Sequence, residues 1–191
     1  MFKRSRPYCS DNDMMLQFKT HILGIPESSI GGIYHATQTV LAPRDRGVTT
    51  FVHELNIEVD IAFFQFNLAP LALRRDIAML GFLHKCNLPN AHPHIRRLFP
   101  PMGATRDTHK RSIWIILSFE TGPTFHAAVL SRSIFHLTHV YNALPQHIAS
   151  INDVSQFQHA LTHIARHKCS QHHLNWQSFL SPRYFTGRLL I

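Results

Sequence analysis

The chain has 191 residues, enough for one domain with a hydrophobic core, and its 45% apolar content excludes a wholly disordered chain. Its formal net charge of +8, from 19 Lys and Arg against 11 Asp and Glu, favours polyanionic partners. The 16 histidines add positive charge as the pH falls.

Cysteine usage and hydropathy predict a soluble, intracellular protein. Cys9, Cys86 and Cys169 are odd in number and far apart, which fits neither a disulfide scaffold nor a four-cysteine zinc site. The longest apolar run, around 113–117, is far below the roughly 18 residues that a membrane-spanning helix needs. We therefore expect no membrane partner, and the choice between nucleus and cytoplasm stays open.

Apolar residues at helical spacing predict short helices in the first part of the chain. Met15, Phe18 and Ile22 share one face of a helix over 14–23. Further helices are expected over 30–41, around Phe51 and Leu55, and over 59–66, where a strand fits equally well. Clustered Pro and Gly predict breaks at 24–32, 43–47, 89–93, 100–103 and 122–123.

The best-defined helix is expected over 70–87, with Pro70 in its first turn. Its apolar stripe is predicted to bury Leu73, Ile77, Met79, Leu80, Leu83 and His84, with Cys86 beside them as a small buried hydrophobe. A glycine in a helix costs about 1 kcal/mol relative to alanine. We therefore expect Gly81 to permit close packing against a neighbouring helix.

Two further helices are expected in the second half, over 131–143 and from Asp153 onward. Asp153 and Gln156 stand at capping-box spacing. The predicted buried face of the last helix is Val154, Phe157, Leu161 and Ile164. One short strand or hairpin is expected near 113–119. The fold class predicted is mainly α, an irregular array of short helices.

The expected domain organisation is a single helical domain over 14–168 with an irregular insert at 100–128. A basic, polar and flexible tail is expected over 1–13, and a C-terminal tail over 169–191.

The residues predict no active site and no cofactor. The nearest carboxylates, Asp11 and Asp13, stand in the polar N-terminal segment, where a solvated tail is the expected structure. No Gly-x-Ser-x-Gly elbow, phosphate loop or dinucleotide fingerprint is present. We expect no catalytic activity from the chain on its own.

Histidines recur at every fourth position in the last helix, at His159, His163 and His167. At about 100° per residue they project opposite Phe157 and Leu161, which places them on the polar face. We therefore favour no metal site. A zinc-bound helical interaction module that uses His163, His167 and Cys169 stays open as an alternative.

Basic residues near helix ends are the candidate binding residues. The candidates for phosphate contact are Arg74, Arg75, Lys85, Arg96 and Arg97. The alternative for each is a solvated charge or a cap at the negative end of a helix. Since Arg74 and Arg75 are adjacent beside an apolar stripe, at least one should face water.

Six segments of the chain follow one another in a recognisable order: ESSIGGIYHATQTVLAPRDR (27–46), FNLAPLALRRDIAMLGFLHKCN (66–87), HIRRLFP (94–100), RSIFHLTHVYNALPQHI (132–148), VSQFQHAL (154–161) and LSPR (180–183). Their order resembles the region downstream of the polymerase core in non-LTR (LINE-type) retrotransposon reverse transcriptases. The segment 102–128 departs from the pattern of the family.

The resemblance implies a helical, thumb-like extension that helps to hold the template–product duplex, with RNA or an RNA–DNA duplex as a weakly bound partner. It also implies the polymerase domain of the parent protein as a partner. The catalytic aspartate pair of the family lies upstream of the resembling segments, so the resemblance assigns no catalytic residue here. The alternative is a decayed, non-functional remnant whose apolar faces lack that partner domain.

Overall fold

The computed structural model describes residues 8–28, 30–98 and 129–184, and in these ranges the fold is mainly α, without a strand. The predicted fold class is therefore confirmed. The expected strand at 113–119 and the whole of the expected insert at 100–128 lie outside the described residues. The elements in chain order are α2 (Asp11–Phe18), the π-helical turn η2 (Lys19–Leu23), α3 (Gly24–Ser28), α4 (Ile30–Ile33), α5 (Gln38–Glu54), α6 (Val59–Phe66), α7 (Leu71–Asn87), α8 (Pro93–Leu98), α10 (Ile134–Asn142), α11 (Gln146–Ala149) and α12 (Val154–Ser170).

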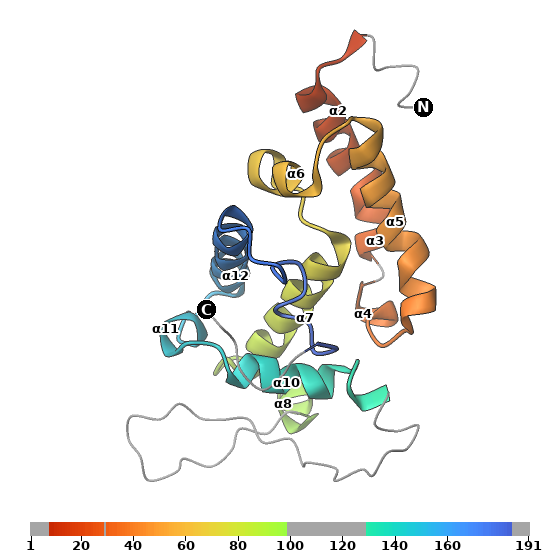
Figure 1. Cartoon of the computed structure of the whole chain (residues 1–191). Coiled ribbons are helices and arrows are strands. Elements are labelled where there is room, and N and C mark those ends of the chain that lie inside the picture. Colours follow the sequence, from red (N-terminus) through yellow and green to blue (C-terminus); the bar gives the residue numbers. More distant parts are fainter. Residues whose placement is uncertain (1–7, 29, 99–128, 185–191) are drawn as a thin grey trace.

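Helix α7 runs through the centre of the molecule, with α2 and α5 on one side and α12 on the other (Figure 1). Its predicted apolar stripe is confirmed, since all six residues of the stripe and Cys86 are buried. Pro70 is the N-cap, and Leu88 is the C-cap. An ideal Cβ added to Gly81 would lie 2.2 Å from the side-chain nitrogen of Gln158 in α12, which confirms close packing there.

Two hydrophobic clusters meet along α6 and α7. The larger joins α7 to α10, α12 and the segment after α12, and it includes Leu73, Leu137 and Phe157. The smaller joins α2, η2, α5 and the start of α7. In it, the rings of Phe18 and Phe51 stack with centroids 4.0 Å apart. Burial of such side chains removes the largest apolar areas from water and is the main stabilising term.

The first helix begins earlier than expected, because the polar N-terminal residues cap it. The Ser10 hydroxyl accepts from the backbone N–H of Asp13 at 3.3 Å, and the Asp13 carboxylate accepts from the Ser10 N–H at 3.2 Å. Asp13 is therefore a capping residue rather than part of a solvated tail. The wider π-helical turn then shifts the buried face, so that Leu23 is buried and Ile22 is 37% exposed.

The helix expected over 30–41 is instead two helices. α4 ends at Ile33, and α5 begins at Gln38 after a short turn. Tyr34 leaves the helical path in this turn and is buried at 3% exposure, with its hydroxyl on Asp76 of α7. A tertiary contact thus overrides a local helical pattern.

The break expected at 43–47 is also absent, since α5 runs through Pro43. Proline inside a helix loses one backbone hydrogen bond. Leu41 and Val48 are buried on either side of this stretch, and Asp45 pairs with an arginine of α7. These tertiary contacts hold the helix together across the proline.

The remaining helices follow the sequence patterns closely. The segment 59–66 is a helix, not a strand. α10 and α12 correspond to the predicted segments, and the Asp153 carboxylate accepts from the backbone N–H of Gln156 at 2.7 Å, as the capping-box spacing predicts. None of the described helices is long and apolar enough to span a bilayer.

The segment after α12 differs from the expected C-terminal tail. Trp176 is 4% exposed and stacks on Phe63 with centroids 5.1 Å apart, and Leu180 is fully buried. The described residues up to 184 are therefore part of the packed domain.

Candidate nucleic-acid interface

The two adjacent arginines of α7 lie in different environments. The side chain of Arg75 is 5% exposed, and its two terminal amino groups donate to both carboxylate oxygens of Asp45 at 2.5 and 2.9 Å. This two-bonded geometry is the strongest that an arginine makes with a carboxylate. Arg75 therefore joins α7 to α5, and the geometry gives it a structural role in place of the expected phosphate contact.

Arg74 lies at the surface of the same turn. Its side chain is 30% exposed, and its Nε donates to the carboxylate of Glu27 in α3. One arginine of the pair thus faces water, as the sequence predicts. Ion pairs this exposed contribute little to stability, so Arg74 can exchange its partner at small cost.

The exposed candidate cations lie at the other end of α7. Lys85 is exposed, and it borders an open groove of about 470 Å³ whose lining includes Phe82 and His92. Phe82 is 40% exposed. A cation beside an accessible aromatic ring is the combination that holds a phosphate backbone and stacks on a base.

Helix α8 follows this groove in the chain and carries the last two candidates. Arg97 is exposed. Arg96 belongs to α8, and its side chain lies outside the described part of the structure. We name Phe82, Lys85, His92 and Arg97 the α7 end surface.

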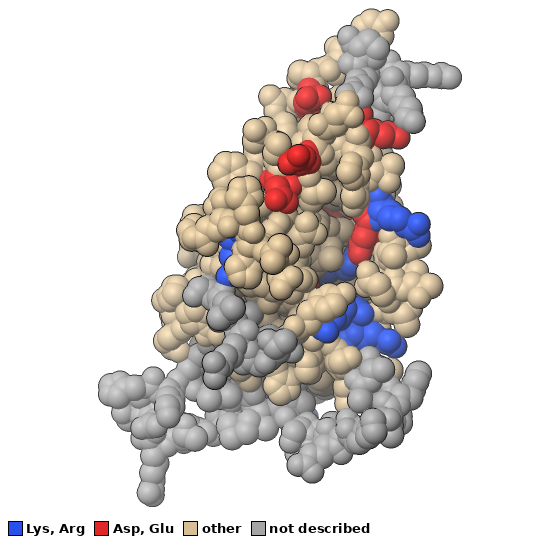
Figure 2. Space-filling model, viewed as in Figure 1, with Lys and Arg blue, Asp and Glu red and all other residues tan. Residues whose placement is uncertain are grey.

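Charged side chains are sparse on the face that Figure 2 shows. Most of the acidic ones lie in its upper part, and most of the basic ones lie toward its right-hand edge and lower right, with one small basic patch at the left (Figure 2). On this face the described basic side chains form no continuous band. A polyanion site on this face would therefore consist of only a few neighbouring cations.

A second group of cations lies where α6 joins α7, and sequence patterns did not indicate it. Asn67 ends α6 in the left-handed conformation at φ 54°. The Lys19 ammonium donates to the carbonyl of Phe66, and Arg166 donates to the side-chain oxygen of Asn67 at 2.8 Å. Burial, and then the nearby charges of Arg74 and Arg166, lower the pKa of Lys19. We name Lys19, Arg74 and Arg166 the junction cluster; they come from three distant parts of the chain.

Asp76, which follows the paired arginines in α7, has a buried carboxyl group. Asp76 accepts a hydrogen bond from the Tyr34 hydroxyl at 3.0 Å, and burial raises its pKa to about 7 although that bond and the charges of Arg75 and Arg183 oppose the change. Arg183 donates to the carbonyls of Tyr34 at 3.1 Å and Ala36 at 3.0 Å. This network ties the C-terminal segment to the turn before α5.

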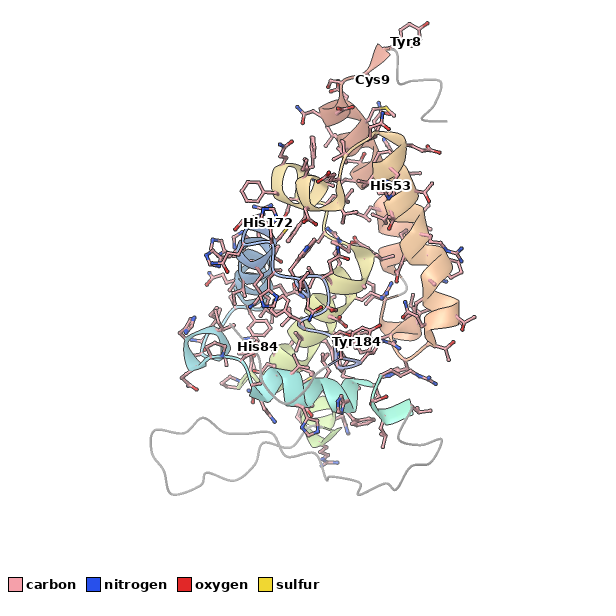
Figure 3. All side chains as sticks on the ribbon, in the orientation of Figure 1. Tyr8, Cys9, His53, His84, His172 and Tyr184 are labelled. Atoms are coloured by element: carbon pink, nitrogen blue, oxygen red, sulfur yellow. The ribbon has the colours of Figure 1, made fainter. Side chains whose placement is uncertain are left out.

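His84 of α7 is buried, and it lies where α7, α10 and α12 come together (Figure 3). Its Nε2 lies 2.6 Å from the carbonyl of Ile151, and its Nδ1 lies 2.9 Å from the Tyr141 hydroxyl. Because a carbonyl only accepts, Nε2 carries the proton and Nδ1 accepts from Tyr141. The Asn87 amide donates to the same hydroxyl at 3.1 Å, and the ring of Phe157 stacks on the imidazole at 4.0 Å. These contacts make His84 a core hydrogen-bonding residue.

The histidines of α12 lie on its solvent face, as predicted. His159, His163 and His167 are exposed, whereas Cys169 is buried at 3% exposure and its thiol faces the carbonyl of Asp60 at 3.9 Å. The ligand set of the zinc alternative therefore does not share one face of the helix. Within the described ranges, no three His, Cys, Asp or Glu side chains are grouped to hold a metal ion.

Comparisons with known proteins give no relative for this chain. No protein-family model matches it, and neither the curated proteins nor the solved structures contain a match. Its function is therefore inferred from the residues and the geometry.

Proposed function

We propose that the chain is the helical region that follows the polymerase core of a LINE-type reverse transcriptase. In this proposal it has no catalytic activity of its own and binds RNA or an RNA–DNA duplex weakly and without regard to sequence. Its second partner is the polymerase domain of the parent protein.

The observation that carries the proposal is that the resembling segments pair with one another around α7. The segment 27–46 supplies the carboxylates of Glu27 and Asp45 to the paired arginines. The segment 132–148 supplies the hydroxyl of Tyr141 to His84 of the segment 66–87. Polar residues that are far apart in sequence thus meet as partners, which supports a common origin for these segments.

The α7 end surface supports the nucleic-acid part of the proposal. Lys85 and Arg97 are exposed, and Phe82 offers a partly exposed ring beside the groove. Each phosphate neutralised on a duplex contributes a slope of about −0.9 in log affinity against log salt concentration. With two to three cations in contact, we expect a shallow slope of about −2 to −3 and weak affinity.

A fluorescence anisotropy titration tests this function. We expect an RNA–DNA duplex to bind the chain, two unrelated duplex sequences to bind equally, and the affinity to fall as salt rises from about 50 to 200 mM. Duplex affinity that does not depend on salt, or no binding at low salt, would contradict the proposal.

A decayed remnant is the second candidate, and exposed apolar side chains are compatible with it. Leu174 is 98% exposed, Ile25 70%, Leu16 62% and Phe64 55%. Such side chains fit either a missing partner domain or a chain that has lost selection for a clean surface. The two candidates differ in whether the isolated chain unfolds cooperatively and binds a duplex.

A further inference from the structure

The junction cluster brings three cations from separate elements to one short connection. Lys19 belongs to η2, Arg74 to the first turns of α7, and Arg166 to α12. Lys19 and Arg166 donate to consecutive residues, the carbonyl of Phe66 and the side chain of Asn67. The side chains of Lys19 and Arg166 therefore meet where α6 ends, and the charge of Arg74 is close enough to act on Lys19.

The charges in this cluster are not balanced by the described residues. Arg74 has the carboxylate of Glu27 as its partner. Lys19 and Arg166 donate to neutral oxygens, and in the described ranges neither forms an ion pair. Positive charges so arranged repel one another unless an anion joins them.

Arg166 also has a hydrogen-bond donor without an acceptor among the described residues. Its guanidinium lies over the ring of Phe63, 5.7 Å from the centroid, and its Nε is buried without a hydrogen-bond partner among the described residues. A buried donor without an acceptor costs about 1 to 3 kcal/mol. An anion that bonds to this atom would remove that cost, and because the Nε is buried, its binding requires a shift of the Arg166 side chain.

Capping of α6 explains only part of the cluster. The carbonyls at the C-terminal end of a helix carry partial negative charge and attract cations. This accounts for the bond from Lys19 to the carbonyl of Phe66. It leaves the Nε of Arg166 without an acceptor.

We propose that the junction cluster binds a single phosphate-type oxyanion, with Lys19 and Arg166 as its main ligands and Arg74 as the third. The source is a phosphodiester of a nucleic-acid strand or free inorganic phosphate, and the first of these rests on the proposed function. An oxyanion accepts several charge-assisted hydrogen bonds at once, which arginine and lysine supply. Burial is the main cause of the lowered pKa of Lys19, and the bound charge would offset the second cause, the repulsion by Arg74 and Arg166.

The test is a titration of the full chain with inorganic phosphate. Calorimetry and the NMR signal of the Lys19 side chain measure the binding, and a titration with chloride at equal ionic strength is the reference. We expect Lys19→Gln and Arg166→Gln each to weaken phosphate binding at least tenfold. Arg46→Gln is the matched control, because Arg46 is an exposed arginine of α5 outside the cluster. Equal phosphate affinity in wild type and both cluster variants, or no binding to the wild type, would overturn the site.

A folding defect is separated from a binding defect by two further variants. Arg166→Lys keeps a charge and removes the Nε donor, so we expect intermediate phosphate affinity. Lys19→Met keeps most of the aliphatic length of the side chain and removes the charge together with the hydrogen bond to the carbonyl of Phe66. Circular dichroism should show native helix content in both; a folded Lys19→Met that binds phosphate as the wild type does would overturn the site.

Duplex titrations distinguish the two sources and separate this inference from the proposed function. Loss of both phosphate and duplex affinity in Lys19→Gln identifies a phosphodiester, whereas loss of phosphate affinity alone identifies free phosphate. If the wild type binds phosphate here but no duplex, the site stands and the proposed function fails. If the wild type binds duplex but no phosphate, and Lys19→Gln leaves duplex affinity unchanged, the site fails and the proposed function stands.

Discussion

Arg75 and Asp45 form a two-bonded ion pair that joins the central helix α7 to α5, with the arginine almost fully buried. The adjacent Arg74 pairs with Glu27 at the surface. Two residues that look equivalent in sequence therefore differ in role, one structural and one free to exchange its partner.

Arg75→Ala is expected to lower the free energy of unfolding by about 3 kcal/mol, because it leaves the Asp45 carboxylate without its partner in a partly buried site. Arg74→Ala is the control, and its exposed pair should cost about 1 kcal/mol or less. Urea denaturation followed by circular dichroism measures both. Equal stability of the two variants would show that Arg75 does not hold the helices together.

Asp76 should make stability depend on pH. Its pKa is raised from an ordinary value of 3.8 to about 7, so the folded state holds a proton that the unfolded state has released. This contribution is fully present below about pH 4 and is lost as the pH rises through about 7.

Asp76→Asn removes this titration while it keeps the shape and the acceptor for Tyr34. We expect the stability of the variant relative to wild type to increase as the pH rises from about 4.5 to 7.5. Urea denaturation of both proteins at several pH values gives the difference in their free energy of unfolding. Contributions from other titrating groups are the same in both proteins and cancel in this difference. A difference that stays constant over the range would contradict the assignment.

Gly81 and Gln158 should be energetically coupled. A Cβ at residue 81 would lie 2.2 to 2.8 Å from three atoms of the Gln158 side chain. We expect Gly81→Ala to displace the Gln158 side chain, and the cost of that displacement should offset the gain of about 1 kcal/mol that alanine gives a helix. The same change in a Gln158→Ala background should be neutral or stabilising.

A double-mutant cycle on the free energy of unfolding measures this coupling. An interaction energy of about 1 kcal/mol or more is expected from removal of the clash. Additive effects of the two substitutions would indicate that α7 and α12 are not packed closely at this point.

Cooperative unfolding separates a functional domain from a remnant. The two clusters share α6 and α7, so they should unfold together. We expect near-ultraviolet and far-ultraviolet circular dichroism to give the same thermal midpoint. A loss of the near-ultraviolet signal at lower temperature, with binding of a hydrophobic dye, would instead favour the remnant.

Local patterns predicted most of the helices and their buried faces. In α7 and α12 the apolar spacing extends over several turns and agrees with the tertiary packing, so the stripe, the cap at Asp153 and the close approach at Gly81 followed from sequence. The prediction was wrong where a contact with a residue far away in the sequence determines the local backbone structure. Tyr34 leaves its helix to reach Asp76, and Pro43 stays inside α5, which Leu41 and Val48 anchor in the core on either side of it.

The candidate site was predictable only in part. The exposure of Lys85 follows from its position on α7, but the burial of Arg75 depends on Asp45 of another helix. The junction cluster depends on three segments that meet only in the folded chain. Arg166 carried no local signal, since a basic residue late in a helix usually serves as a solvated charge or a cap.

The most direct test of the proposed function is the salt dependence of RNA–DNA duplex binding by the double variant Lys85→Gln, Arg97→Gln. We expect weaker binding to all duplex sequences alike and a salt slope that is smaller in magnitude by about 2, because each substitution removes one cation that neutralises a phosphate. Arg46→Gln should leave both quantities unchanged. An unchanged slope and affinity in the double variant would contradict a nucleic-acid interface at the end of α7.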